Sequence, residues 1–474
     1  MLCPVGRGRM KMNKKIRDIA WILGMNVVFI VLLVLFAANR ELADPMMSIV
    51  IPMLIVTSGA LVYTIHFEGD LVIAMSAILL LEIGQMTQVL INEGVSSMPT
   101  ILLFVSPVFG AVCVAVISYL GKKDLGDEKK AQKALIIVAG GVVLITLILL
   151  TIGRNINGTK AWLVLGPLSL QLTELFKPLY VLFHAVLWKS SLSHKKRFIF
   201  STAMTLGSAG LLLIINELGT LLVILLMWII LTFIYSEKLL DTAIVLGGTL
   251  LTVLGGYGVL GLVYSRVKSK ILLGEKPAGL SKKLYQIFDK LHQRVMIFTD
   301  LDQYMIEYKD EASRQPVKAR EMIMNGGLFG STRRTTIPIE NSDYAYVGLI
   351  LRCGIVFAIV VLVLFFIILY RSLLKSVRMD NRFESVMFTG AALGLILPTF
   401  INVMGTTNFS FMTGIAVPFI SHGGTNMLLS VFNVMLLIWG TAGIRPNITL
   451  PAPAKASSEQ KADTPEQEEI PFTR

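Results

Sequence analysis

The sequence predicts an all-α polytopic membrane protein with about twelve transmembrane helices and one large extracellular loop. Three observations lead to this fold class. The 474 residues are 54% apolar and only 16% charged, with a mean hydropathy of +0.71, which is more apolar sequence than a soluble core of this size needs. The apolar residues gather in long runs. A single long polar stretch, Tyr264 to Ser342, separates the last three runs from the others.

Each apolar run is long enough to cross a bilayer. Backbone groups in hydrocarbon must form their hydrogen bonds within the protein, so helices are the expected spanning form. The expected spans are 20–38, 47–65, 70–91, 99–120, 132–152, 171–188, 198–215, 218–235, 241–263, 343–370, 384–404 and 411–440.

Basic residues cluster at 11–17, 122–130, 195–197 and 371–382. With twelve spans all four clusters fall on one side, which the positive-inside rule makes cytoplasmic. Both termini are then expected in the cytoplasm and the polar stretch 264–342 outside. The net charge of +12 is dispersed among the spans without a binding motif, so nucleic acid is not an expected partner.

The two ends of the chain carry further expectations. A basic segment followed by the run Trp21 to Ala38 resembles a signal peptide, but no small-residue cleavage site ends the run, so we expect a retained first span. Residues 446–474 are rich in Pro, Lys, Glu and Gln and are expected to form a disordered cytoplasmic tail. The three cysteines and five histidines show no metal-ligand spacing, so no metal site is predicted.

Inside the polar stretch, apolar residues recur at helical spacing, with basic residues on the opposite face. This pattern predicts an amphipathic helix that lies on the membrane surface. Its apolar positions are Leu284, Ile287, Phe288, Leu291 and Val295.

Several polar residues occur where the membrane makes them costly. Glu174 and Lys177 lie three apart on one helical face, where they can pair. Glu82, Glu217 and Arg352 also have apolar surroundings in the sequence. Ionisable residues inside a membrane are candidates for function, although an ion pair between helices explains each of them as well.

Residues Val417 to Asn426 interrupt the final apolar run with Pro418, two glycines and a histidine. Such a segment permits a broken helix or a re-entrant loop, which membranes tolerate only where it lines a cavity.

Motifs in this order resemble the SEDS family (shape, elongation, division and sporulation), which includes FtsW, RodA and SpoVE. Pro418 to Asn426 is similar to the family's Pro-Phe-Ile-Ser-Tyr-Gly-Gly-Ser-Ser, with His422 in place of Tyr. Glu217 to Thr220 is similar to its Asp-Leu-Gly-Thr. Residues 157–177 carry the Asn-Gly, Trp, Gly, Gln, Glu and Lys of a third motif, with Ala161 where Arg is usual.

The polar stretch adds two more motifs. Gln315 and Gly326 to Gly330 keep the family's spacing between its Gln and its Gly-Gly-Leu-x-Gly, and Ile337 to Tyr344 is similar to its Leu-Pro-Glu-x-x-Thr-Asp-Phe. The resemblance covers about 70–445. The resemblance therefore implies a family core with two additions. They are residues 1–69, which include two extra transmembrane helices, and the tail 446–474.

The resemblance implies a peptidoglycan glycosyltransferase that polymerises lipid II, the undecaprenyl-pyrophosphate disaccharide-pentapeptide, at the outer face of the bacterial cytoplasmic membrane during division, elongation or sporulation. The implied partners are a class B penicillin-binding protein transpeptidase and other divisome or elongasome membrane proteins. The resemblance establishes no cofactor, and the candidate is a divalent cation, Mg²⁺ or Mn²⁺.

A carboxylate is expected to act as general base on the acceptor hydroxyl. The family's catalytic Asp segment slips out of register here, because the chain between Arg294 and Gln315 is about four residues longer than usual. Asp310 is the nearest Asp to the count back from Gln315, and Asp302 is the fallback. The expected substrate-binding residues are Lys160, Gln171, Glu174, Lys177, Glu217, Gln315, Ser421, His422, Gly423 and Gly424.

Two other functions remain open at this point. Broken helices and intramembrane Glu residues also fit a transporter or flippase for a lipid-linked sugar. A catalytically silent scaffold for a transpeptidase fits the slipped Asp segment and Leu351-Arg352, which replaces a Glu-Glu pair of the family. The long polar stretch favours the enzyme, since transport needs no such loop.

Overall fold

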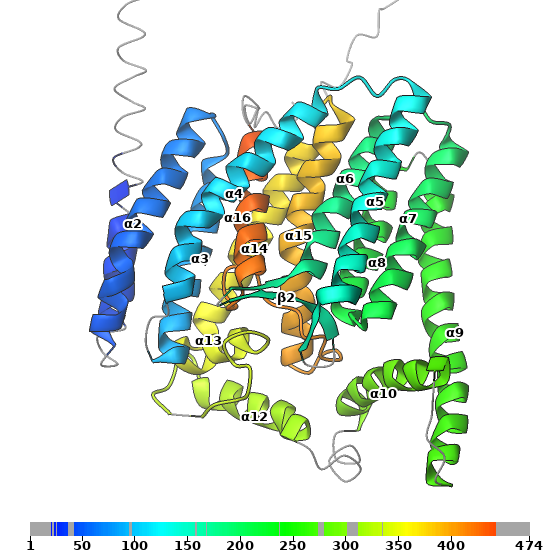
Figure 1. Ribbon diagram of the computed structural model, residues 1–474. Coiled ribbons are helices and arrows are strands. Elements are labelled where there is room, and N and C mark those ends of the chain that lie inside the picture. Colours follow the sequence, from blue (N-terminus) through cyan, green and yellow to red (C-terminus); the bar gives the residue numbers. More distant parts are fainter. Residues whose placement is uncertain are drawn as a thin grey trace, which may run out of the picture.

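The computed structural model describes residues 20, 23–24, 26–36, 42–93, 97–156, 159–166, 168–236, 238–273, 279–300, 311–333 and 335–441. Within them the chain is a bundle of helices with one small sheet (Figure 1). The helices are α2 Ala43–His66, α3 Leu71–Asn92, α4 Ser97–Gly121, α5 Glu128–Ile152, η1 Leu172–Leu175, α6 Phe176–Lys189, α7 His194–Ile215, α8 Leu218–Tyr235, α9 Leu239–Leu272, α10 Gly279–Thr299, α12 Glu311–Gly326, α13 Ala345–Cys353, α14 Ile355–Ser376, α15 Arg382–Thr406 and α16 Gly424–Gly440.

The two ends of the bundle differ. One end carries α10, α12, α13 and the sheet, at the bottom of Figure 1, and is called here the loop end. The other end carries the connections 122–127, 190–193 and 377–381, and is called the basic end because three of the four basic clusters flank these connections.

The chain is a multi-pass membrane protein by length and composition. The described residues include nine helices long and apolar enough to cross a membrane, and shorter apolar helices at Asn26–Phe36 and Gly424–Gly440. The expected count of about twelve spans is therefore not confirmed within this part of the chain. The all-α polytopic class is confirmed.

Three expected spans differ from the helices observed. The run 171–188 opens with the end of a strand and a 3-10 turn, and only Phe176–Lys189 is α-helical. The run 343–370 is split at Gly354, whose φ of +92° breaks the helix into α13 and α14. In the run 411–440 only the part from Gly424 is helical, because Pro418 and two positive-φ residues interrupt the backbone before it.

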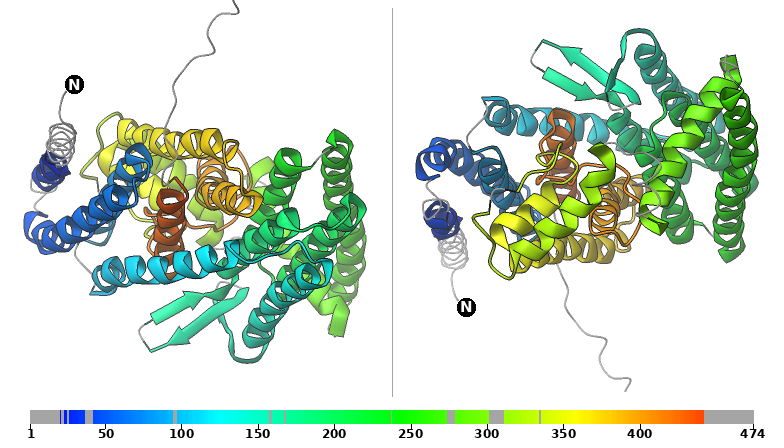
Figure 2. Two further views of the ribbon diagram at one scale, coloured as in Figure 1. Left: turned by 90° about the horizontal axis from the view of Figure 1, so that it is seen from above. Right: turned by 90° about the horizontal axis from the view of Figure 1, so that it is seen from below.

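A three-stranded antiparallel sheet at the loop end was not expected. Its strands are β1 Arg154–Ile156, β2 Thr159–Leu165 and β3 Leu168–Gln171, in the order β1-β2-β3. Figure 2 shows it projecting beside the helices. The sheet leads into η1, and thereby places the third sequence motif at the loop end.

The expected helix in the polar stretch is confirmed as α10, and its position on the membrane surface stays a prediction. It packs against α9, which runs eight residues beyond Tyr264 into the stretch expected to be polar loop. Phe288 of α10 is buried, and its ring centroid lies 5.0 Å from that of Tyr264. The apolar face of α10 thus covers the loop end of α9.

The centre of the bundle is formed by α3 and α15. Of the apolar window in each of these helices 83% is buried, against 6% for α9, which lies at the periphery (Figure 2). The largest fully buried side chains include Phe176, Tyr180, Phe383 and Phe388. Helices that are buried all round define the interior of a membrane bundle, and polar groups on them are shielded from lipid.

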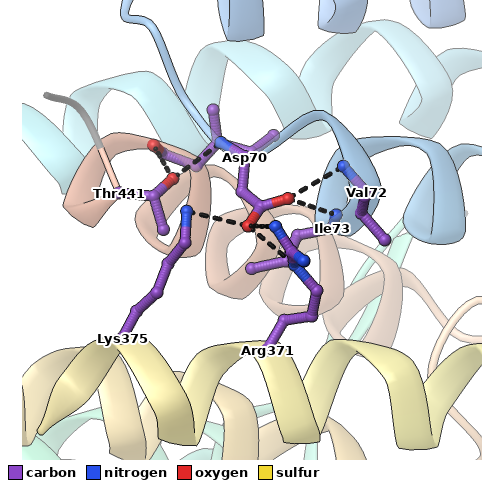
Figure 3. Close-up of polar contacts among 7 residues, drawn as sticks. Asp70, Val72, Ile73, Arg371, Lys375 and Thr441 are labelled. Atoms are coloured by element: carbon purple, nitrogen blue, oxygen red, sulfur yellow. Dashed lines mark hydrogen bonds and ion pairs between the residues drawn. The ribbon is translucent and has the colours of Figure 1, made fainter. Parts of the chain in front are cut away.

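A carboxylate fixes the start of α3 at the basic end (Figure 3). Asp70 Oδ1 accepts hydrogen bonds from the N–H groups of Val72 and Ile73, at 2.9 and 3.3 Å, as an N-cap does. Its Oδ2 accepts from Arg371, at 2.9 and 2.7 Å, and lies 2.8 Å from Lys375 Nζ. The Asp70 N–H also donates to Thr441 Oγ1 at 2.9 Å. This basic-end clasp joins α3, α14 and the end of α16.

Candidate functional site

A cavity of about 330 Å³ opens at the loop end of the bundle. It lies between the sheet, the start of α8, α10 and two non-helical segments. Its walls combine charged, polar and apolar groups, as small-molecule sites do. The lining residues are Ile156, Thr159, Trp162, Ser169, Gln171, Glu217, Leu218, Arg294, Ile339, Ser342, Asp343, Thr413, Gly414, Ala416, His422, Gly423, Gly424, Thr425 and Asn426.

Side chains of the two central helices hold the two non-helical segments, 339–344 and 413–423. Gln88 of α3 donates from Nε2 to the carbonyls of Asn341 and Ile420, at 3.0 and 2.7 Å. Asn402 of α15 donates from Nδ2 to the carbonyls of Asp343 and Ile415, at 2.7 and 2.6 Å. Each amide therefore bridges both segments, so that α3 and α15 set the distance between them.

The segments are also joined directly. The Ser421 hydroxyl donates to the Ser342 carbonyl at 2.6 Å and accepts from the Val417 N–H at 2.9 Å. The His422 N–H donates to the Asn341 carbonyl at 2.7 Å. Backbone held by this many side-chain contacts gives the cavity wall a fixed geometry, which a binding or catalytic site requires.

Glycines allow the close packing behind this wall. A Cβ on Gly84 of α3 would lie 2.2 Å from the Phe419 carbonyl oxygen, so a larger residue would push the segment away from the helix. In the Gly326–Gly330 turn, a Cβ on Gly330 would lie 2.1 Å from the Arg352 carbonyl oxygen. This motif thus packs its backbone against the end of α13.

Arg352 forms an ion pair with Glu340, twelve residues before it in the sequence. Its guanidinium lies 2.7 Å from a carboxylate oxygen of Glu340, and its Nε donates to the Leu90 carbonyl at 2.9 Å. Both charged side chains are buried. A buried charge needs such compensation, so Arg352 ties segment 339–344 to α3 and α13.

Three charged side chains from distant parts of the chain meet at the cavity. Glu217 precedes α8, Arg294 lies on α10, and Asp343 belongs to segment 339–344. Burial raises the pKa of Asp343 to about 7; the charge of Arg294 opposes this shift and that of Glu217 adds to it. Burial likewise lowers the pKa of Arg294, which the carboxylates of Glu217 and Asp343 oppose.

Gly414 makes room for this cluster. Its φ of +72° is in the left-handed region, and a Cβ there would lie 3.1 Å from Asp343 Oδ2 and 3.9 Å from Arg294 Nη2. The carboxylate and the guanidinium therefore face the same small space beside Gly414.

The cavity also meets the N-terminus of α16. Gly423 is the N-cap residue and supplies no side-chain hydrogen bond, and the cavity lining includes Gly423 and Gly424 at this helix start. Burial lowers the pKa of His422, which keeps its imidazole neutral near pH 7. The positive potential here comes from the helix end and from Arg294.

The expected substrate-binding residues fall into three groups. Gln171, Glu217, His422, Gly423 and Gly424 line the cavity. The remaining two groups lie elsewhere at or near the loop end.

The expected pairing of Glu174 with Lys177 is confirmed. The pair lines a separate small cavity of about 20 Å³ between α6, α15 and α16. Asn426 lines both cavities, so the pair lies directly behind the main site.

Lys160, Gln315 and Ser421 are not among the described residues that line the main cavity. Lys160 Nζ donates to the Leu150 carbonyl, Gln315 is partly buried on α12, and Ser421 holds the wall from behind. Asp310, the expected base, and Asp302 lie outside the described residues.

The sequence analysis did not select Arg294, Asp343 or Thr413 as site residues. Asp343 belongs to the stretch Ile337 to Tyr344, which resembles a family motif, and that position was its available signal, whereas Arg294 marked only the start of the stretch that is longer than usual. Thr413 carried none, because it lies in an ordinary apolar run.

No group of three or more His, Cys, Asp or Glu residues within the described ranges could hold a metal ion. At the cavity, Glu217 and Asp343 share their space with a guanidinium, and a cation-binding cage would exclude that positive charge. These residues do not fit a divalent cation.

Comparisons with known proteins agree on one family. The FtsW/RodA/SpoVE model, described as "Cell cycle protein", matches residues 70–440. The chain is 25% identical to "Probable peptidoglycan glycosyltransferase FtsW" of Caulobacter vibrioides over 327 residues, 67% of this chain and 73% of the relative. It is 23% identical to the FtsW of Bacillus subtilis over 335 residues, 68% of this chain and 74% of the relative.

Solved structures share the fold. A chain from a study of a peptidoglycan synthase complex that coordinates polymerization and crosslinking has a TM-score of 0.55 at 20% identity, over 78% of this chain and 97% of the other. The rod shape determining protein RodA of Thermus thermophilus has a TM-score of 0.50 at 18% identity, over 78% and 96% of the two chains.

Proposed function

The chain belongs to the FtsW/RodA/SpoVE family, and we propose that it is a peptidoglycan glycosyltransferase that polymerises lipid II into glycan strands. Relatives that carry this activity in their names align with two thirds of the chain. The observation that carries the proposal is the loop-end cavity, in which four of the motifs that resemble the family contribute lining residues around Glu217, Arg294 and Asp343.

The basic residues support an orientation for this site. Lys122, Lys195 and Arg378 lie at or beside the basic end, and positive charge near membrane-spanning helices favours the cytoplasm. The loop end then faces the outside of the bacterial cytoplasmic membrane, where a lipid-linked disaccharide presents its sugars, and both termini lie in the cytoplasm.

The reaction joins an acceptor sugar hydroxyl to the anomeric carbon of a donor whose leaving group is a lipid pyrophosphate. The hydroxyl is a weak nucleophile, so a carboxylate that accepts its proton accelerates the attack. We propose Asp310 for this role on the register argument from the sequence, with Asp302 as the fallback. In the sequence both residues lie between α10, which contributes Arg294 to the cavity lining, and α12.

The cavity residues would bind the substrate around this base. Gln171 and Glu217 offer hydrogen-bond acceptors, and the first turn of α16 offers donors. The Glu174–Lys177 pair lines the small cavity that shares Asn426 with the main cavity. We also propose a class B penicillin-binding protein as partner, on the analogy of the solved synthase complex that shares this fold.

The test uses the purified full-length protein with labelled lipid II, with and without a class B penicillin-binding protein. We expect glycan polymer from the wild type, loss of polymer in Asp310→Ala, and polymer retained in Asp302→Ala. Polymer lost only in Asp302→Ala would move the base to that residue. A well-folded protein that yields no polymer under any condition would refute the proposal and leave a flippase or a scaffold.

A further inference from the structure

A second cavity, of about 350 Å³, lies among the membrane-spanning helices and shares no lining residue with the loop-end cavity. It is called here the membrane groove. Its described lining is apolar apart from the hydroxyl of Tyr63, and an apolar space of this kind holds hydrocarbon rather than water. The lining residues come from α2, α3, α4, α16 and the segment before α16, and are Ile55, Val56, Gly59, Ala60, Tyr63, Ala74, Ala77, Ile78, Leu81, Phe104, Pro107, Phe419, Val431, Val434, Met435 and Ile438.

The membrane groove is continuous with the surface that lipid covers. Ile55 of α2 and Phe104 of α4 are 56% and 42% exposed, and both helices are long and apolar enough to cross a membrane. On the opposite side of the groove, Ala74 of α3 and Ile438 of α16 are buried. Figure 2 shows α2 at the edge of the bundle and α16 in its interior. The groove therefore leads from the bilayer hydrocarbon toward the centre of the bundle.

The groove follows the helix axes in the half of the membrane next to the basic end. Its lining extends from Ala74 to Leu81 on α3, which begins at the basic end. Seven positions along a helix correspond to about 10 Å. Tyr63 lies one turn from the end of α2, also at the basic end, and tyrosine hydroxyls in membrane proteins gather at the level of the lipid head groups.

The size of the groove decides between a lipid chain and a protein helix as its occupant. A helix is about 10 Å wide, and one turn of 5.4 Å then fills roughly 400 Å³. The whole groove is smaller than that single turn. A single hydrocarbon chain that runs along the membrane normal fits its shape, its length and its apolar lining.

The inner side of the groove is formed by Phe419, which belongs to segment 413–423 of the loop-end cavity wall. Ala416 and His422, three positions away on either side, line that cavity. Phe419 has a φ of +64°, a conformation that residues other than glycine rarely adopt, so its surroundings must hold it in place. The other side of the groove is α2, which precedes the residues 70–440 that the family model matches.

We propose that the membrane groove binds one acyl chain of a phospholipid from the leaflet at the basic end. The chain enters between α2 and α4, passes Tyr63 near its ester, and ends against the ring of Phe419. Its methylene groups supply packing contacts to residues that otherwise border an unfilled space. A bilayer lipid thereby supports the wall of the loop-end cavity from behind, through a groove that the helix outside the matched core completes.

Photocrosslinking tests the site and the direction of the chain. The full-length protein is placed in nanodiscs of phosphatidylethanolamine and phosphatidylglycerol, with a phosphatidylglycerol that carries a diazirine either near the ester or at the chain end. After irradiation, mass spectrometry locates the crosslinked residues. We expect the probe with the diazirine near the ester to label Tyr63, and the chain-end probe to label Phe419. Both should label the groove more than the exposed Leu251 of α9.

Gly59→Trp blocks the groove, because Gly59 lines it and has no atom within 4 Å of a Cβ placed there. Labelling of Phe419 should fall roughly tenfold, the loss expected when a ligand must overpack an apolar site. Gly207→Trp on α7 is the matched control, since Gly207 is also exposed on a spanning helix, has no atom within 4 Å, and lies outside the groove lining. Labelling in that variant should equal that of wild type.

Three results would overturn the proposal. Groove labelling no stronger than that of Leu251 would show ordinary lipid contact only. Equal labelling of Phe419 in Gly59→Trp and Gly207→Trp would show that the chain does not occupy the groove. Labelling of the groove by a photoactivatable polyprenyl phosphate, without competition from phosphatidylglycerol, would assign it to a prenyl chain instead. None of these measurements uses lipid II polymerisation, so their outcome is independent of the proposed function.

Discussion

Replacing Gln88 with leucine tests whether the central helices hold the cavity wall. The side-chain amide donates to the carbonyls of Asn341 and Ile420 at 3.0 and 2.7 Å. In Gln88→Leu the Asn341 carbonyl keeps the His422 N–H as a donor, whereas the Ile420 carbonyl loses the amide. One replaceable hydrogen bond is worth about 1 kcal/mol and one buried carbonyl left without a donor costs about 1–3 kcal/mol.

The expected loss is therefore roughly 2–4 kcal/mol in the free energy of unfolding. We expect a lower thermal unfolding temperature for the purified protein in lipid nanodiscs. Polymerisation of labelled lipid II should fall more steeply than stability alone explains, because a shift of about 1 Å in a catalytic wall can cost a hundredfold in rate.

Gln132→Leu is the matched control, since Gln132 lies on α5 and its amide donates to Glu128 at 3.0 Å. Unfolding temperature and polymerisation rate should stay close to wild type in that variant. If Gln88→Leu matches the control in both measurements, the two segments do not depend on α3, and the reasoning about the wall is wrong.

Three other predictions follow from single contacts. In the folded protein the pKa of Asp343 is about 7, above its ordinary value of 3.8, so the protonated carboxyl stabilises the fold. This contribution is complete below pH 3.8 and is lost as the pH rises through 7. Thermal unfolding between pH 5 and pH 8 should therefore depend less on pH in Asp343→Asn than in wild type; an unchanged dependence would contradict the assignment. Glu340→Gln should lower the free energy of unfolding by about 3–5 kcal/mol, because it leaves the buried Arg352 without its carboxylate. Adding Arg352→Met should recover much of this loss, which chemical denaturation can measure. Additive losses in the double variant would show that the pair does not interact. Asp70→Ala removes a cap and two ion pairs, so amide hydrogen exchange should speed up at the start of α3 and stay unchanged at the loop end, and uniform protection would refute the clasp.

The membrane helices could be predicted because their signal is local. A run of about twenty apolar residues specifies a spanning helix without reference to the rest of the chain. The break before Gly424 had a signal in Pro418 and the two glycines, whereas the break at Gly354 was harder to place, because the residues on both sides are apolar and only its positive φ interrupts the helix. The sheet had a weak signal of its own: Thr159 to Leu165 is rich in strand-forming residues and ends at Gly166.

The charged cluster could not be assembled from the sequence. Glu217, Arg294 and Asp343 come from three elements far apart in the chain, and only the fold brings them to one cavity. The Arg352–Glu340 pair shows the same limit at shorter range. The sequence marked Arg352 as a departure from the family's pattern, but its compensating carboxylate lies across a turn that periodicity does not describe.

The amides of Gln88 and Asn402 have a mechanical consequence. Each lies on a central helix and donates to both segments of the cavity wall, so the angle between α3 and α15 sets the distance between these segments. A change in that angle moves Asp343 without any contact at the cavity.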